Sequence, residues 1–528
     1  MEVLITANIT FEHLCKAVIG EFTGETLVVD RSSGGKKLYS KEQYLERINA
    51  FAASLSGKLS KYPHGTWVGF CCKNSADWIA VLFAVTKCGC APVLLNSEWS
   101  SEQINAYSKK LSMPVVIDDD AARANELTAE AVLLYPQDLT QTDPAASGVS
   151  GEWADKLAFV TSGTTSQPKL YIFSAESLLR ETISVAEMPL LYEVLPMERL
   201  KRFLQVLPLR HCFGLGTLFI LWRIGATAVF PENLGILTLV QAIREEDINC
   251  IASVPAVWKG LMSIVRIKTK TAEITPETFS AVYGDTFVTG ICAGARTEER
   301  LQQDFKGLPF TMMNGWGMTE VGIALIGPFG AYKNSKYTGE LVPAAAYQMR
   351  VLLPDGSIAE QGTGELLING DCLYCESVTD AAIIPRSGEW FHTGDIFEID
   401  GTHFLFHGRC KSVMIGESGE NLYPEELEEQ FSSVIPDAVP FCIVGDQERP
   451  VLFLDGSVLQ DADAETLTGA IRAHNSTLLP SYRLTQIILT TQPILRTSKG
   501  EPARFRLMDE FRKAPDAYKQ IILQKGLS

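Results

Sequence analysis

Short apolar runs alternate with helix-type patterns through most of the first 400 residues, and this alternation limits the fold more than any other feature. Runs of strand length indicate buried strands, whereas longer segments with apolar residues three or four positions apart indicate helices. Strands that alternate with helices pair into parallel sheets, because each helix crosses back over the sheet. We therefore expect an α/β fold with a large N-terminal domain of βαβ-type subdomains.

Local signals place several of these elements. Segments 40–43 and 100–103 have the form of a capping box, in which a serine and a glutamine three residues later satisfy the first N–H groups of a helix. A helix is predicted within 74–89, followed by a buried strand at 91–95. Further strands are predicted at 203–207, 226–230, 251–254 and 287–291.

The pattern changes after Arg409, where a compact α+β unit is expected. Its strands are predicted at 412–415, 439–444, 451–454 and 484–489, and its helices from Pro424 and over 464–474. Because 528 residues are too many for one hydrophobic core, we expect two domains, residues 1–409 and a small mobile domain of residues 410–528.

Composition excludes several classes of partner and location. The formal net charge of −17 disfavours nucleic acid and anionic membranes as partners. The most apolar stretch, 215–230, is short and interrupted by Arg223, so no membrane insertion is expected. The N-terminus has no secretory signal, which predicts a cytoplasmic protein. The 12 cysteines lie mostly in apolar runs, and the pair Cys372 and Cys375 has no second pair that would indicate a zinc site.

The segment 159–169 has the chemistry of a phosphate-binding loop. Hydroxyl residues and Gly163 follow an apolar run, and Lys169 closes the segment. Glycine lets backbone N–H groups approach an anion, the hydroxyls add donors, and the lysine adds positive charge. The G-x-x-x-x-G-K-[ST] P-loop is absent from the sequence, so this is a phosphate loop of another kind.

This loop, Thr-Ser-Gly-Thr-Thr-x-x-Pro-Lys, resembles the signature of the adenylate-forming (AMP-binding) enzymes. Other segments resemble later motifs of that superfamily in the same order, over roughly the whole chain: 292–295, 314–320, 391–395, 406–411 and 418–428. The resemblance implies an ATP site built from Thr161, Ser162, Gly163, Thr164, Thr165, Lys169, Gly294, Asn314, Trp316, Gly317, Thr319, Asp395, Arg409 and Lys411.

The resemblance also assigns roles within that site. Trp316 is expected to stack on adenine, Thr319 to bind the α-phosphate, and the two oxygens of Asp395 to accept the ribose hydroxyls. Arg409 is expected to reach the ribose or a phosphate. Lys411 is the expected hinge of the small domain.

Metal and catalytic residues follow from the same resemblance. Mg²⁺ is expected on Glu320 and Thr165, because it prefers hard oxygen ligands and usually takes only one or two carboxylates. The predicted catalytic residues are Lys499, Thr164, Glu320 and His211.

His211 follows Leu-Pro-Leu-Arg, where superfamily members that act on acids other than amino acids carry an aromatic residue or a histidine. No aspartate stands in this motif to pair with an α-ammonium group, so an α-amino acid is disfavoured as the substrate. The apolar run that follows suits an aryl or acyl tail, and it suits plain core equally.

The chain departs from the superfamily at the catalytic lysine. Ungapped alignment places Glu501 where that lysine belongs, and Lys499 stands two residues earlier. A loop can absorb this displacement, because a lysine side chain reaches about 6 Å toward a point charge. Ser166 and Leu170 also replace usual glycines of the phosphate loop.

The predicted function is that of acyl- or aryl-CoA synthetases, with ATP, Mg²⁺ and CoA or phosphopantetheine as cofactors. A carboxylic acid forms an acyl-adenylate, and a thiol of CoA or an acyl carrier protein then takes the acyl group. Alternatives are a non-catalytic nucleotide-binding relative, motivated by the displaced lysine, and a luciferase-type oxygenase. A penicillin-recognising hydrolase is disfavoured because the S-x-x-K match at 166–169 lacks its partner motifs. The acid, the thiol acceptor and the oligomeric state stay open.

Overall fold

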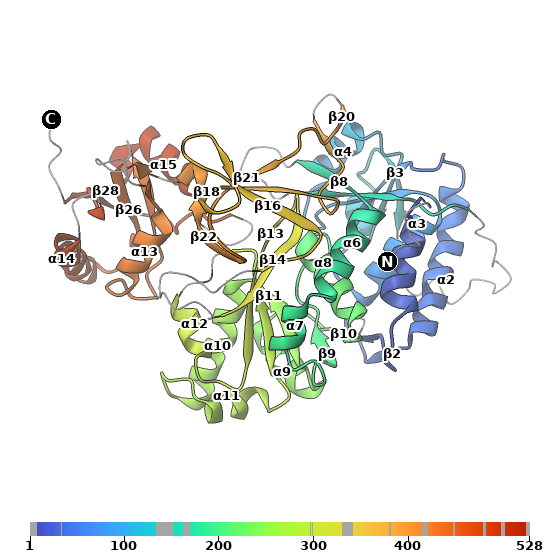
Figure 1. Cartoon of the computed structure of the whole chain (residues 1–528), viewed down its shortest axis with the longest axis horizontal. Helices are drawn as coiled ribbons and strands as arrows, with labels where there is room; N and C mark the ends of the chain where they lie inside the picture. Colours follow the sequence, from blue (N-terminus) through green and yellow to red (C-terminus); the bar gives the residue numbers. More distant parts are fainter. Residues whose placement is uncertain are drawn as a thin grey trace.

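The computed structural model describes residues 8–32, 34–133, 151–161, 169–295, 297, 299–329, 342–379, 382–412, 414–415, 421–446, 449–478, 482–497 and 502–523. Their strands form two large sheets, a five-stranded sheet, a four-stranded sheet and a two-stranded ribbon. Figure 1 shows the four-stranded sheet with its helices at one end of the molecule, beside the five-stranded sheet.

The first large sheet has nine described strands and is parallel through its centre. Its order is β15-β14-β13-β12-β11-β9-β10-β1-β2, with antiparallel pairing at both edges. Along the sheet the strands are β15 (Val342–Pro343), β14 (Gly322–Pro328), β13 (Thr311–Met318), β12 (Thr289–Cys292), β11 (Cys250–Ser253), β9 (Arg202–Leu204), β10 (Thr227–Phe230), β1 (Val28–Asp30) and β2 (Lys37–Tyr39).

The second large sheet has eight described strands in the order β20-β19-β8-β7-β4-β3-β5-β6. The run from β7 to β6 is parallel, whereas β8, β19 and β20 are antiparallel additions. Along the sheet the strands are β20 (Ile383–Pro385), β19 (Glu376–Val378), β8 (Leu170–Ser174), β7 (Lys156–Val160), β4 (Ala91–Leu94), β3 (Trp67–Cys71), β5 (Val115–Asp118) and β6 (Glu130–Leu133).

Two helices, α3 (Ala76–Lys87) and α8 (Cys212–Arg223), lie in the core shared by the two large sheets. Both are apolar on nearly every side, as expected for a helix with no solvent-facing surface. One hydrophobic cluster joins them to strands of both sheets, and α1 (Phe11–Cys15), α2 (Lys41–Leu59) and α6 (Ala175–Ala186) contribute to it.

The remaining helices of the large domain cover the outer faces or connect the strands. The outer face of the nine-stranded sheet packs against α9 (Ile236–Glu245), α10 (Pro255–Thr269), α11 (Pro276–Tyr283) and α12 (Glu299–Phe305). The other sheet packs against α4 (Ser101–Lys110). Shorter helices are α5 (Ala121–Ala124), α7 (Pro189–Val194) and a π-helix at Lys16–Gly20.

Five strands between residues 347 and 409 form a wholly antiparallel sheet, which the βαβ interpretation of the first 400 residues did not anticipate. Its order is β17-β16-β18-β21-β22. The strands are β17 (Ile358–Ala359), β16 (Tyr347–Leu352), β18 (Gly362–Gly370), β21 (Phe391–Asp400) and β22 (His403–Arg409). Short turns join β16, β17 and β18, and another joins β21 and β22, and such turns favour antiparallel pairing. The longer connection from β18 to β21, residues 371–390, carries β19 and β20 of the eight-stranded sheet.

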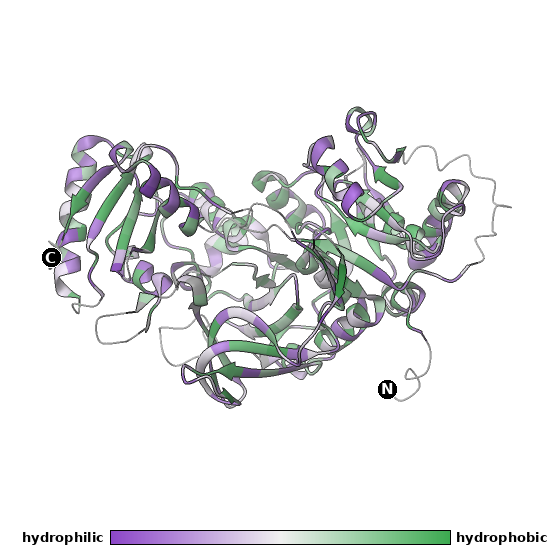
Figure 2. Cartoon of the chain, turned by 90° about the horizontal axis from the view of Figure 1, so that it is seen from above, coloured by the Kyte–Doolittle hydropathy of each residue, from purple (hydrophilic) through white to green (hydrophobic). Residues whose placement is uncertain are grey.

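The small C-terminal domain centres on the sheet β25-β26-β27-β28. The strands are β25 (Phe441–Asp446), β26 (Arg449–Asp455), β27 (Gln486–Thr490) and β28 (Lys519–Ile522), and β23 (Met414–Ile415) and β24 (Asn421–Leu422) form the ribbon. The helices are α13 (Pro424–Ser432), α14 (Asp461–Thr477) and α15 (Arg504–Lys513), with short 3₁₀ turns at Cys410–Ser412, Gly456–Val458 and Pro515–Ala517. In Figure 2 its strands are mainly hydrophobic and its helices carry hydrophilic stretches.

The fold confirms the predicted α/β class with a large N-terminal and a small C-terminal domain. Capping boxes form at Ser40 and Ser100, and the predicted strands occur within one or two residues of their expected bounds, except that β9 ends at Leu204, three residues before the predicted end. The exact boundary at residues 409 and 410 stays a prediction. Among the described helices, none has both the length and the apolar content that a bilayer crossing requires.

Candidate active site

The predicted phosphate loop joins two antiparallel strands, β7 and β8. Its ends are tied together: the Thr161 N–H donates to the Lys169 carbonyl at 2.8 Å, and the Lys169 N–H donates to the Thr161 hydroxyl at 3.0 Å. Ser162, Gly163, Thr164 and Thr165 lie outside the described residues. The neck of the loop therefore stands at the carboxyl end of a parallel strand, where open α/β sheets bind ligands.

The second signature forms a hairpin at the end of β13. Thr319 and Glu320 occupy the turn between β13 and β14. Gly317 allows the hairpin to close, because a Cβ there would stand 2.1 Å from the Gly322 carbonyl oxygen. Gly322 itself has φ +86°, a conformation that favours glycine.

Tyr171 connects the first two signatures, and sequence reasoning missed it. It is a buried residue of β8 and lies near enough to Glu320 for that carboxylate to act on its phenol. Burial raises the pKa of the Tyr171 phenol, and the Glu320 charge raises it further. The sequence did contain an indication that Tyr171 faces the site. Side chains two positions apart on a strand share a face, and Tyr171 is two residues from Lys169.

The predicted adenine and ribose residues meet directly. The indole N–H of Trp316 donates to Asp395 Oδ2 at 2.9 Å, and Arg409 Nε lies 2.8 Å from Asp395 Oδ1. Asp395 and Arg409 are cross-strand partners on β21 and β22. Asp395 is only 2% exposed, so Trp316 and Arg409 both contact a buried carboxylate.

The Thr-Gly-Asp segment is held by a residue that the sequence did not indicate. Glu365 of β18 accepts a hydrogen bond from the Gly394 N–H at 2.9 Å, and its other oxygen lies 2.9 Å from His392 Nδ1. The Thr393 hydroxyl accepts from the Asp395 N–H at 3.1 Å. These bonds fix the backbone that carries Asp395.

The small-residue loop at Gly294 follows β12 and faces the start of α8. Gly294 has φ +84°, and a Cβ built on it would lie 3.9 Å from the Phe213 ring. Asn314, the partner of Cys292 across β12 and β13, is buried and accepts from the Thr297 hydroxyl at 3.5 Å. The loop at Gly294 and the first turn of α8 are therefore neighbours.

His211 is the residue immediately before α8. Its Nε2 contacts the guanidinium of Arg210, and a guanidinium is a donor without acceptor capacity. In this contact Nε2 can act only as the acceptor. Burial lowers the pKa of Arg210, so this cation lies in a poorly solvated position.

The C-terminal elements hold the ends of the segment that contains Lys499. Lys499 itself lies outside the described residues, as does the Lys411 side chain, although Lys411 follows β22 in a 3₁₀ turn. Arg496 and Pro502 form a β-bridge, and the Ala503 N–H donates to the Leu495 carbonyl at 2.8 Å.

Arg504 anchors the following helix. Both terminal nitrogens of its guanidinium contact carboxylates of α13. Nη2 lies 2.8 Å from each oxygen of Glu428, and Nη1 lies 3.0 Å from Glu425 Oε1. Arg504 Nε also donates to the Ile443 carbonyl at 3.0 Å.

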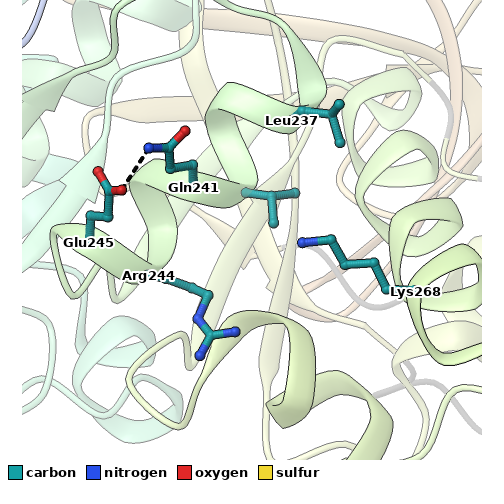
Figure 3. Close-up of a pocket in the computed structure, with 6 residues that line it drawn as sticks. Leu237, Gln241, Arg244, Glu245 and Lys268 are labelled. Carbon is teal, nitrogen blue, oxygen red and sulfur yellow. Dashed lines mark hydrogen bonds between the residues drawn. The ribbon is translucent and has the colours of Figure 1, made fainter.

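A hollow of about 400 Å³ lies elsewhere, between α9 and α10 (Figure 3). Its lining is Leu237, Val240, Gln241, Arg244, Glu245 and Lys268. None of these is a predicted site residue, and Gln241 donates to Glu245 within the same helix at 2.6 Å. We assign this hollow no role in the chemistry.

Residues 17–375 match the AMP-binding enzyme family, and the chain belongs to that family. Its relatives include the indoleacetate–CoA ligase of Aromatoleum aromaticum, 26% identical over 84% of this chain and 88% of the relative. Among solved structures, the o-succinylbenzoate CoA synthetase of Bacillus subtilis with its acyl-adenylate is 16% identical, with a TM-score of 0.72 over 94% of this chain and 97% of that one. ATP-bound MatB of Rhodopseudomonas palustris is 17% identical, with a TM-score of 0.74 over 94% and 98%. Both solved structures share the fold of this chain.

Proposed function

We propose that this chain is an ATP-dependent, AMP-forming acid–CoA ligase. The observation that carries the proposal is the cluster of Trp316, Asp395 and Arg409 in a chain of the AMP-binding enzyme family. The hairpin that carries Trp316 also carries Glu320, which lies beside Tyr171 near the neck of the phosphate loop. The related indoleacetate enzyme is named as a CoA ligase, which supports CoA as the thiol acceptor here.

Mg²⁺ fits the residues around Glu320. Among the described residues there is no group of three or more His, Cys, Asp or Glu side chains that could hold a metal alone. Mg²⁺ on ATP needs only one or two protein carboxylates, because phosphates and waters supply the other ligands. Glu320, together with Thr165, would hold the ion, which neutralises phosphate charge when bound.

The first step joins the acid to AMP. One carboxylate oxygen of the acid attacks the α-phosphorus, the bond to the β-phosphate oxygen breaks, and pyrophosphate leaves. Lys169 and the loop hydroxyls neutralise the departing phosphates, Thr319 positions the α-phosphate, and Lys499 lies against the developing charge. Such fixed charges and donors lower the barrier because they need no reorganisation during the reaction.

The second step transfers the acyl group to sulfur. The thiol loses its proton and attacks the carbonyl carbon, the bond to the phosphate oxygen breaks, and AMP leaves. Rotation of the small domain about Lys411 would withdraw Lys499 and admit the phosphopantetheine arm.

The substrate is an acid other than an α-amino acid, with its tail along α8 beyond His211. A cytoplasmic location belongs to the same proposal.

ATP–pyrophosphate exchange with a panel of aliphatic, aryl and amino acids tests this function. We expect exchange with at least one acid, and a loss of about 10²–10³-fold in Lys499→Ala, since one charge-stabilising group is removed. Lys513→Ala is the matched control, because Lys513 pairs only with Asp509 on the surface of α15 among the described residues.

Two results would contradict the proposal. Measurable ATP binding without exchange for any acid would indicate a non-catalytic nucleotide-binding relative. Unchanged exchange in Lys499→Ala would move the catalytic role to another residue, with Glu501 marking the position to examine.

A further inference from the structure

Glu181 is a buried carboxyl group that the reaction described above does not use. It lies on α6, on the same face as Leu178, Thr182 and Val185, and is 3% exposed. Its neighbour Arg180 points to the other side and pairs with Glu176 at 2.7 Å. A carboxyl group in such a place costs free energy unless polar partners replace the water it has lost.

Its partners in the described structure are few. The Ile323 N–H donates to Glu181 Oε1 at 2.6 Å, and in the described part of the chain Glu181 has no ion pair and no other hydrogen bond. Burial raises its pKa to about 8. The side chains that face it from other elements, Tyr347 and Cys372, carry no charge at neutral pH because burial raises both of their pKa values.

Two glycines provide the space that the carboxyl group occupies. A Cβ on Gly322 would stand 2.6–2.7 Å from its three terminal atoms, and a Cβ on Gly216 would stand 3.3 Å from Oε1. Gly216 belongs to α8 and Gly322 begins β14. The carboxyl group therefore lies between α8 and the turn that carries Glu320.

The position along α8 places Glu181 beside the path of the acid. Gly216 is one helical turn, about 4.5 Å, beyond Phe213, the residue that faces the Gly294 loop. Residues 213 and 216 share a face of the helix. Gly216 has no side chain of its own, and a Cβ built there would meet Glu181 Oε1 and Ile323 Cδ1, both at 3.3 Å. A tail that extends from the adenylate along this face would therefore meet Glu181 beside Ile323.

We propose that Glu181 selects the substrate by accepting a hydrogen bond from a hydroxyl or amino group on the tail of the acid. This inference rests on the proposed function and names its substrate class, acids that carry a hydrogen-bond donor besides the reacting carboxyl group. A desolvated group with one backbone partner discriminates strongly, because an analogue without the donor leaves it unsatisfied.

The competing explanation is purely structural. Through Ile323, Glu181 also supports the turn after Glu320, and a brace alone would not distinguish between acids. Glu181→Gln preserves the bond from Ile323, since an amide oxygen accepts as a carboxyl oxygen does. Glu181→Leu removes both the acceptor for the substrate and the acceptor for the Ile323 N–H. Comparison of the two variants therefore separates selection from support.

The test uses pairs of acids that differ only in hydroxyl or amino versus methyl on the tail. Their binding to the full chain is measured by calorimetry without ATP, and kcat/KM is measured by ATP–pyrophosphate exchange. For the wild type we expect binding at least about tenfold tighter for the donor-bearing acid. This ratio should fall below about threefold in Glu181→Leu. Glu181→Gln should keep the hydroxyl preference and lose the amino preference, because the positive charge of an ammonium group favours the ionised form of Glu181, and an amide has no ionised form.

Glu176→Gln and Glu176→Leu are the matched controls, because Glu176 is on the same helix but exposed. If Glu181→Leu does not fold, the selective loss of the amino preference in Glu181→Gln carries the test. Donor preferences that are absent in the wild type, or equal in wild type and both Glu181 variants, overturn the inference. A donor preference in binding without exchange would support the inference while the proposed ligase function fails.

Discussion

Asp395 shows how much a single buried residue decides in this site. Its Oδ2 already accepts a hydrogen bond from the Trp316 indole N–H, and its Oδ1 forms an ion pair with Arg409. A carboxylate offers about four lone-pair sites, so ribose hydroxyls can share it with both groups. The arrangement also holds the Trp316 ring by its edge, which fixes the plane on which adenine is predicted to stack.

The position of Tyr171 beside Glu320 leads to a prediction about the metal. A partner that orients a ligating carboxylate usually accounts for 10–100-fold in metal affinity. We expect Tyr171→Phe to raise the Mg²⁺ concentration needed for half-maximal ATP binding about tenfold, measured by calorimetry at fixed ATP. Tyr192→Phe, an exposed tyrosine, should leave it unchanged. Equal Mg²⁺ dependence in wild type and Tyr171→Phe would refute this role.

The raised pKa of Glu181 predicts a dependence of stability on pH. The folded chain holds this proton up to about pH 8, whereas the unfolded chain releases it near pH 4.5. The stability that this proton contributes is therefore fully present below pH 4.5 and is lost as pH rises to about 8. The total loss is at most about 4–5 kcal/mol.

Glu181→Gln does not titrate, so its stability relative to wild type should increase from pH 5 to pH 8. Thermal unfolding across this range, followed for the large domain, measures the change. Parallel curves for the two proteins would show that Glu181 is already ionised at pH 5.

At the scale of elements, the hairpin β13–β14 depends on close backbone contact. A Cβ at Gly317 would stand 2.1 Å from the Gly322 carbonyl oxygen, and backbone has little freedom to move away. We expect Gly317→Ala to open the hairpin, displace Thr319 and Glu320, and reduce exchange at least about 100-fold.

Gly57→Ala is the control for this substitution. Gly57 lies within α2 with no atom near the position of a Cβ, so alanine should stabilise the helix by about 0.5–1 kcal/mol. Circular dichroism and exchange are measured for both variants. Full activity in Gly317→Ala would mean that the hairpin closes differently.

At the scale of the whole molecule, Arg300 of α12 and Asp437 after α13 pair across the two domains. Both side chains are more than half exposed, so the pair should contribute less than about 1 kcal/mol to the arrangement seen in Figure 1. We expect Arg300→Glu to change the ratio of thioester formation to exchange by less than about fivefold. The double variant Arg300→Glu, Asp437→Arg should restore the ratio.

Ionic strength provides the check on this prediction. An exposed pair is screened by salt, so the effect of Arg300→Glu should disappear near 1 M NaCl. An effect that is large and insensitive to salt would show that Arg300 acts through something other than this ion pair.

The sequence by itself determined the α/β class, the capped helices and the set of chemistry-bearing motifs. These features depend on local patterns: capping at Ser40 and Ser100, apolar periodicity, and residue types such as Gly163 or Asp395 whose chemistry is intrinsic. The sequence also indicated α3 as a helix from its spacing, because helix periodicity is visible within one segment.

Only the tertiary structure decided which side chains meet. Tyr171 and Glu320 are 149 positions apart, and Glu181 and Ile323 are 142 apart, so no local pattern could pair them. The antiparallel sheet of β16, β17, β18, β21 and β22 likewise depends on long-range pairing, since residues 371–390 separate β18 from its partner β21. The burial that makes Glu181 a distinctive carboxyl group exists only once α6, α8 and β14 have packed, because desolvation is a property of the assembled core.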